Sequence, residues 1–96
     1  MFIVSLEYKS SLAEVDKFLS EHIEYLKIQY EKGNFIASGR KIPRTGGIIL
    51  SQMDTKEALQ NVLDQDPFKI NDLATYEIQE FIPSMTSDKF RNLKEE

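Results

Sequence analysis

The chain has 96 residues, with 12 lysines and arginines against 16 aspartates and glutamates, and a formal net charge of −4 at pH 7. That length corresponds to a single domain, and the acidic balance argues against a protein that binds a phosphate backbone. No apolar run approaches the roughly 20 residues of a membrane helix. The sequence contains no cysteine, which excludes disulfides and thiol catalysis and fits a reducing compartment. We therefore expect a cytoplasmic protein that binds neither nucleic acid nor membrane.

The first two predicted elements differ in the period of their apolar residues. Residues 2–8 place apolar side chains at every second position, which predicts a strand. Ser11 and Glu14 form a capping box, a pattern that begins helices. Apolar residues then recur three and four positions apart until Gly33, which favours a helix stop. We expect one long helix over residues 11–32.

The middle of the chain predicts a hairpin and a shorter helix. Residues 34–41 and 46–53 are short apolar runs, separated by a loop that contains proline and glycine. A second capping box at residues 54–57 begins the helix. Pro67 interrupts that helix, because a proline disfavours helical angles at the residue before it.

The last predicted strand covers residues 73–82, and Pro83 ends its hydrogen-bonded ladder. Residues 1–83 are expected to form the domain, and residues 84–96 a polar tail or short helix. The resulting order is βαββαβ. With right-handed crossovers, this order gives an α+β ferredoxin-like plait, a four-stranded antiparallel sheet with two helices on one face.

The other face of such a sheet has no helix to cover it. Its candidate residues are mixed but substantially apolar, and they are Ile3, Ser5, Ile36, Ser38, Ile48, Leu50 and Phe81 or their neighbours in the alternation. Four strands expose a patch of roughly 400 Å². Because monomers rarely leave such a patch open, we expect a homodimer that pairs through this face.

His22 is the only histidine, and it lies on the apolar face of the first predicted helix. A structural histidine with one satisfied nitrogen is the more common case at such a position. The alternative is a sheltered imidazole that gives or takes a proton during catalysis. One histidine and scattered carboxylates provide no metal-ligand spacing, so we expect no metal and no other cofactor.

Asp66 is the best candidate for the acid that orients His22, because it stands where Pro67 interrupts the second helix. In the functional interpretation its carboxylate fixes the imidazole tautomer. A helix-end turn cap is the structural alternative. Four other aspartates remain possible partners, namely Asp16, Asp54, Asp64 and Asp72. A nucleophilic serine is disfavoured, because the strained Gly-x-Ser-x-Gly turn is missing.

The segment from Ser38 to Gly47 holds the remaining candidates. Arg44 has a planar guanidinium that suits carboxylate or phosphate groups. Glycines allow close backbone approach and can present N–H groups to an anion. The predicted substrate-binding residues are Ser38, Gly39, Arg44, Gly46 and Gly47. A plain hairpin with solvated charges is the alternative, and no phosphate-loop or dinucleotide motif is present.

Several of these segments, taken together, resemble the YciI-like family, the YCII-related domain. They are residues 2–6, His22, residues 35–39, 43–47, 66–68 and 76–81. The resemblance covers residues 1–83 in order. It implies a dimeric α/β barrel and a site built around a His–Asp pair, here His22 and Asp66. The family usually continues Ser-Gly-Pro, whereas this chain has Arg40 after Gly39.

We therefore predict a small cofactor-independent enzyme of YciI-like type. His22 and Asp66 would perform general acid/base chemistry of lyase, isomerase or elimination type on a small anionic or phenolic substrate. The alternative is a non-catalytic homodimer that binds a small ligand in the same pocket. A pure interaction module is a third interpretation, and it predicts no pocket between the first helix and the sheet.

Overall fold

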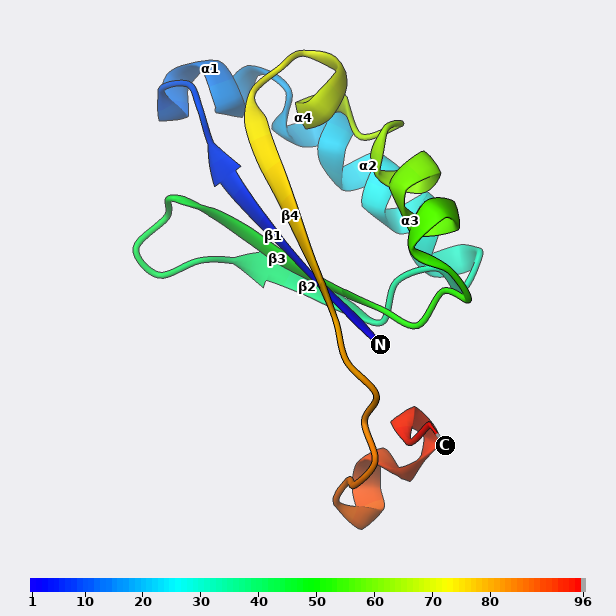
Figure 1. The fold of residues 1–96 in the computed structure, drawn as a ribbon. Coiled ribbons are helices and arrows are strands. Elements are labelled where there is room, and N and C mark those ends of the chain that lie inside the picture. The colour runs from blue at the N-terminus through cyan, green and yellow to red at the C-terminus, as the bar shows by residue number, and fades with distance from the viewer. Residues whose placement is uncertain (96) are drawn as a thin grey trace.

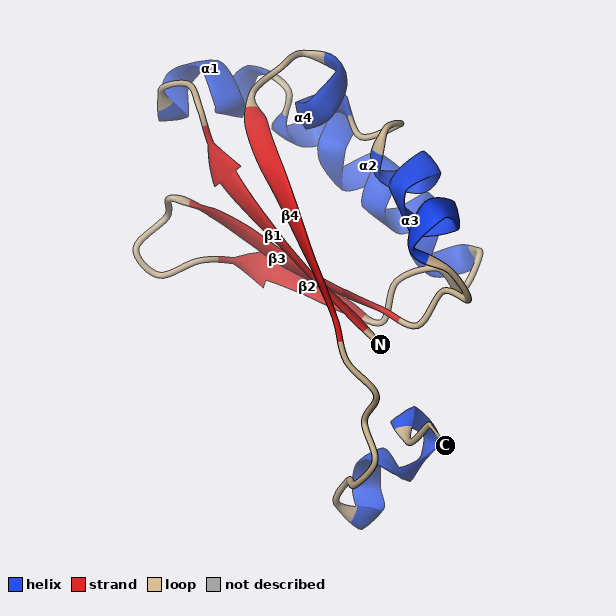
Figure 2. Ribbon diagram, viewed as in Figure 1, coloured by secondary structure: helices blue, strands red, loops and turns tan. Residues whose placement is uncertain are grey.

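The computed structural model describes residues 1–95 of the chain as a four-stranded antiparallel sheet with helices on one face (Figure 1, Figure 2). The strands are β1 (Phe2–Tyr8), β2 (Ala37–Arg40), β3 (Gly46–Ser51) and β4 (Ala74–Glu80). The helices are α1 (Leu12–Lys17), α2 (Leu19–Glu31), α3 (Lys56–Leu63), α4 (Pro67–Ile70) and the 3₁₀ helix η1 (Asp88–Leu93). The strand order β2-β3-β1-β4 is that of the predicted ferredoxin-like fold, which is confirmed.

Helix starts and stops follow from local hydrogen bonds. At the start of α1, the Ser11 hydroxyl accepts a hydrogen bond from the backbone N–H of Glu14. At the start of α3, Thr55 accepts from the N–H of Ala58 at 3.1 Å. Gly33 takes a φ of 77° just after α2, in the left-handed region that favours glycine.

The helix predicted over residues 11–32 is two helices. Phe18, with φ −111° and ψ 6°, separates α1 from α2 and no side chain caps the second helix there. The two helices run in different directions in Figure 1. The apolar spacing continues across the break, which is why periodicity alone predicts a single helix.

The core lies between the sheet and the helices. Alternate β1 side chains, those of Phe2, Val4 and Leu6, are buried there. Ile3 lies on the opposite, open face of the sheet, and its partner across the β1–β3 ladder is Leu50. This alternation fixes the two faces, which the sequence left undecided.

Strand β2 corrects one expectation about these faces. Ser38 pairs with Ile49, which is buried on the helix side, and the Ser38 hydroxyl contacts the Tyr30 hydroxyl of α2. Ser38 therefore lies on the helix side and not on the open face. Arg40, two residues further along β2, shares that side.

The segment after β4 returns to the domain. The backbone N–H of Glu95 donates to the carbonyl of Pro83, and the Gln52 side-chain amide donates to the carbonyl of Leu93 at 2.9 Å. Glu96, the end of the predicted tail, lies outside the described residues. Across residues 1–95, no helix has the length and apolarity to cross a membrane.

Candidate active site

His22 and Asp66 come together although 44 positions separate them in the chain. His22 Nδ1 lies 2.7 Å from Asp66 Oδ1. Helix α2 brings the imidazole to this point, and the turn between α3 and α4 brings the carboxylate. The His22 side chain is 12% exposed and that of Asp66 is 0% exposed. The pair is thus buried on the Asp66 side, while the imidazole keeps a small accessible edge.

The Asp66 carboxylate has donors on both oxygens. Besides His22, the N–H of Phe68 donates to Oδ1 at 3.0 Å and the Tyr76 hydroxyl donates to Oδ2 at 2.7 Å. An ionised carboxylate only accepts hydrogen bonds, so we assign the proton of neutral His22 to Nδ1. The Nε2 lone pair then remains available for a proton in transit.

The neighbouring phenols hold their protons firmly. Burial and the negative charge of Asp66 raise the pKa of Tyr76 well above its ordinary value of 10.0. The same causes, in the same order, raise the pKa of Tyr25, whose hydroxyl donates to the carbonyl of Val62 at 2.7 Å. Both groups therefore act as hydrogen-bond donors and not as anions at neutral pH.

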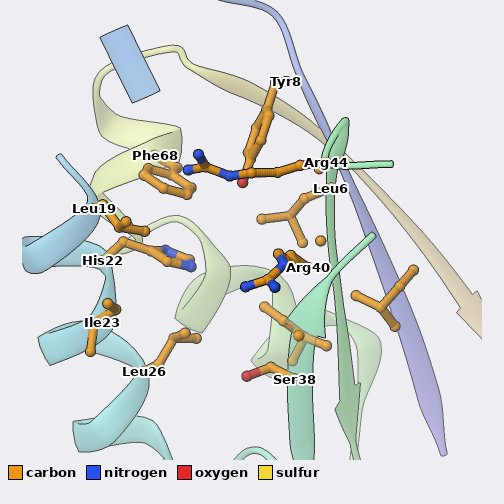
Figure 3. Close-up of a pocket in the computed structure, with 15 residues that line it drawn as sticks. Leu6, Tyr8, Leu19, His22, Ile23, Leu26, Ser38, Arg40, Arg44 and Phe68 are labelled. Atoms are coloured by element: carbon orange, nitrogen blue, oxygen red, sulfur yellow. The ribbon is translucent and has the colours of Figure 1, made fainter. Parts of the chain in front are cut away.

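A cavity of about 490 Å³ opens between α2 and the β2–β3 hairpin. Its size is ordinary for a small-molecule site. The lining includes His22 and every predicted substrate-binding residue, namely Ser38, Gly39, Arg44, Gly46 and Gly47. In Figure 3, His22 projects from α2 into this space. Asp66 is not part of the lining. It lies behind the imidazole and contacts Nδ1.

Apolar residues of the first predicted helix line the cavity as well. Leu19 and Leu26 flank His22 on α2 and are only half-buried. The fully packed face of α2 carries Tyr25 and Gln29 instead. His22 therefore lies at the boundary between the core and the cavity.

Arg44 enters the cavity already paired. Its guanidinium donates to the carboxylate of Asp16 on α1 and lies 5.9 Å from the centroid of the Tyr8 ring. The hydrogen bond from Arg44 lowers the pKa of Asp16, and the same bond raises the pKa of Arg44. In Figure 3 the Arg44 side chain extends toward Phe68.

Three of the four other aspartates considered as partners for His22 form ion pairs with other residues. Asp64 pairs with Lys69 at 2.8 Å, and Asp72 pairs with Lys9. Asp16 pairs with Arg44. Among residues 1–95, no group of three histidine, cysteine or acidic side chains is arranged to hold a metal ion.

Arg40, Phe68 and Tyr76 contribute to the site and were not among the predicted site residues. Arg40 and Phe68 line the cavity, and Tyr76 hydrogen-bonds Asp66. The arginine after Ser38-Gly39, where the resemblance implies a proline, was the available signal for Arg40. Phe68 lies two residues after Asp66, so its place near the site could be expected from the sequence. Tyr76 comes near Asp66 only because β4 pairs with β1.

The family comparison covers nearly the whole domain. The YCII-related domain matches residues 1–82. The chain belongs to this family. The resemblance found in the sequence is therefore confirmed, and this YCII-related domain carries the family's fold.

A solved structure with the same fold is 5-chloro-2-hydroxyhydroquinone dehydrochlorinase (TftG) from Burkholderia phenoliruptrix AC1100, in complex with 2,5-dihydroxybenzoquinone. The two are 14% identical, with a TM-score of 0.71 over 83% of this chain and 91% of that chain. At this identity the likeness concerns the fold. No functionally curated protein matches this YCII-related domain.

Proposed function

We propose that this YCII-related domain is a small enzyme that uses His22 and Asp66 as a general acid/base pair, without a cofactor. The observation that carries the proposal is the 2.7 Å contact between His22 Nδ1 and a fully buried carboxylate, with the imidazole lining a cavity. A histidine held in one tautomer beside an open cavity suits a proton transfer to or from a bound molecule.

The roles follow from the positions. His22 Nε2 takes a proton from a substrate atom in the cavity and returns it to the same or another atom. Asp66 holds the ring and stabilises the imidazolium that forms meanwhile. Arg44 and the glycine-containing segment bind an oxygen that gains negative charge in the transition state. Such a set of groups suits isomerisation or elimination reactions.

A phenolic or anionic substrate is part of this proposal. The neighbouring dehydrochlorinase is named for a substituted hydroxyhydroquinone and was solved with a dihydroxybenzoquinone. A phenol that tautomerises needs one proton removed from oxygen and one added to carbon, or the reverse. A single histidine can perform both steps in turn, so the proposed site suits such a tautomerisation. The chlorinated substrate itself is not carried over.

A proton-exchange experiment tests this function with 1,2,4-trihydroxybenzene under argon in D₂O. Catalysed tautomerisation replaces ring hydrogens by deuterium, which proton NMR records directly. We expect the wild-type protein to accelerate the exchange and His22→Gln to lower the catalysed rate about 10²–10⁴-fold. Glu21→Gln, an exposed neighbour on α2 outside the cavity lining, is the matched control and retains the rate.

Two outcomes contradict the proposal. Full exchange activity in a folded His22→Gln protein excludes the histidine from the chemistry. Binding of the phenol without any acceleration by the wild-type protein favours the alternative, a non-catalytic ligand-binding dimer. Circular dichroism and a two-dimensional NMR spectrum establish that each variant is folded.

The homodimer and the cytoplasmic location are also proposals. Ile3 and Leu50 meet on the open sheet face, where the described chain places no helix over them. A second copy that covers this face would remove their apolar surface from water. The cytoplasmic location rests on the cysteine-free sequence. The division of the chain at residue 83 into domain and tail likewise stays a prediction.

A further inference from the structure

Arg40 is directed into the cavity from the edge strand of the sheet. It lies in β2 opposite Gly47 of β3, and it shares the helix side of the sheet with Ser38. Figure 3 shows its guanidinium extending from the strand toward His22 on α2. The side chain therefore approaches the proposed reaction centre from across the cavity.

The charge of Arg40 is not balanced within the site. Over residues 1–95, no carboxylate forms an ion pair with Arg40, whereas Arg44 is paired with Asp16. The cavity lining contains Arg40, Arg44 and His22 and no acidic residue. This is a local positive region on a chain whose formal net charge is −4. Such a region favours an anionic ligand.

The rest of the lining describes the body of that ligand. Leu19, Ile23 and Leu26 contribute apolar walls. The buried ring of Phe68 stacks on the His22 imidazole, with ring centroids 3.9 Å apart. A flat ring with one anionic substituent matches both the apolar walls and the positively charged region of the cavity. One unpaired guanidinium suits a monoanionic carboxylate, which its planar fork can bind through two parallel hydrogen bonds.

We propose that Arg40 determines specificity in this protein by binding the carboxylate of an aromatic hydroxy acid, with the ring held beside His22. The inference rests on the proposed function for the position of the reacting atom, but binding itself is independent of turnover.

Two probes that differ by one carboxylate test the inference: 2,5-dihydroxybenzoate and hydroquinone, with dissociation constants measured by calorimetry or NMR titration. We expect the wild-type protein to bind the benzoate at least about tenfold more tightly. Arg40→Gln is expected to lose that preference while its affinity for hydroquinone changes less than about twofold. Lys41→Gln removes the same charge from the next residue, which lies outside the lining, and is expected to keep the preference.

The results separate the two proposals. Equal binding of the probes by the wild-type protein, binding of neither, or an unchanged preference in Arg40→Gln overturns the role of Arg40. Equal losses in the Arg40 and Lys41 variants also overturn it, because a general field effect would then account for the preference. The binding results do not bear on deuterium exchange into 1,2,4-trihydroxybenzene, because that phenol has no carboxylate. Failure of the exchange experiment would likewise leave the binding preference intact.

Discussion

Gly46 lies so close to Leu6 that a β-carbon on the glycine would be 1.8 Å from the Leu6 carbonyl oxygen. The contact occurs in the β1–β3 ladder, where Gly46 pairs with Glu7. It sets how closely the β2–β3 hairpin approaches β1, and the hairpin carries Ser38 and Arg40 into the cavity. Gly46 therefore has a structural role besides the ligand-binding role predicted for it.

Gly46→Ala is expected to destabilise the protein by about 2 kcal/mol or more, because backbone must move to admit the methyl group. Gly39→Ala is the matched control: a β-carbon there meets nothing within 4 Å, so the change is expected to stay within about 1 kcal/mol. Urea unfolding of both variants measures the difference. Equal stabilities would show that the ladder relaxes freely around Gly46.

Asp66→Asn tests the orientation of the imidazole. The variant keeps the side-chain size but replaces one acceptor oxygen by an amide donor, so it no longer accepts on both sides. We expect a loss of the Nδ1–H tautomer of His22, read from imidazole ¹⁵N shifts, and a fall of about 10²–10⁴-fold in catalysed exchange. An unchanged tautomer would show that Asp66 does not hold the ring.

Tyr76→Phe tests the buried network at high pH. The raised pKa of Tyr76 means that the folded protein keeps this proton when the unfolded chain loses it. The resulting stability is fully present below the ordinary pKa of 10.0 and declines as pH rises above it. The free energy of unfolding of the wild type should therefore fall more steeply above pH 10 than that of Tyr76→Phe.

Two further measurements complete the Tyr76 experiment. At pH 7 the variant is expected to be less stable by about 1–3 kcal/mol, because Asp66 loses one donor. Absorbance titration at 295 nm reports phenolate formation, and it should show fewer groups ionising near pH 10 than the tyrosine content of the chain. Identical slopes for wild type and variant would mean that Tyr76 ionises as an unperturbed phenol.

Local sequence signals were sufficient to name His22 and Asp66 as candidates for a pair. Pro67 marks the end of a helix, and the residue before it must leave helical angles, so Asp66 was expected at a turn. His22 was the only imidazole. The structure brings the two within 2.7 Å, but it does not test catalysis. The functional role of the pair stays a prediction.

Other features depend on long-range pairing and were beyond the sequence. Tyr76 reaches Asp66 because β4 lies beside β1, and Arg40 reaches the cavity because β2 presents that face to α2. A four-residue strand with Ser, Gly and Arg has no apolar alternation that would reveal its faces. The break at Phe18 was missed for a similar reason, since apolar spacing is preserved across it.

Asp16→Asn tests whether Arg44 is restrained by its partner. The Arg44 hydrogen bond lowers the pKa of Asp16, so the pair persists at neutral pH and below the ordinary carboxyl pKa. Removing the acid frees the guanidinium for a ligand in the cavity. We expect 2,5-dihydroxybenzoate to bind about two- to fivefold more tightly to the variant at low ionic strength, with less difference in high salt.

A weaker affinity in Asp16→Asn would support a different role for the ion pair, namely that Asp16 holds Arg44 in its binding position. Asp54→Asn supplies the control, because it removes the same charge from a residue outside the cavity lining. An equal gain in both variants would assign the effect to net charge alone.

Leu50→Glu tests the proposed dimer. Leu50 lies beside Ile3 on the open sheet face, and a charge there would be buried between two sheets if that face pairs with a second copy. We expect the wild type to elute as a dimer in size-exclusion chromatography with light scattering, and Leu50→Glu as a folded monomer. Ile70→Glu, 67% exposed on α4 in the helix layer, should remain dimeric. A monomeric wild type, or a dimer that tolerates Leu50→Glu, would place the open face in contact with solvent or with another partner.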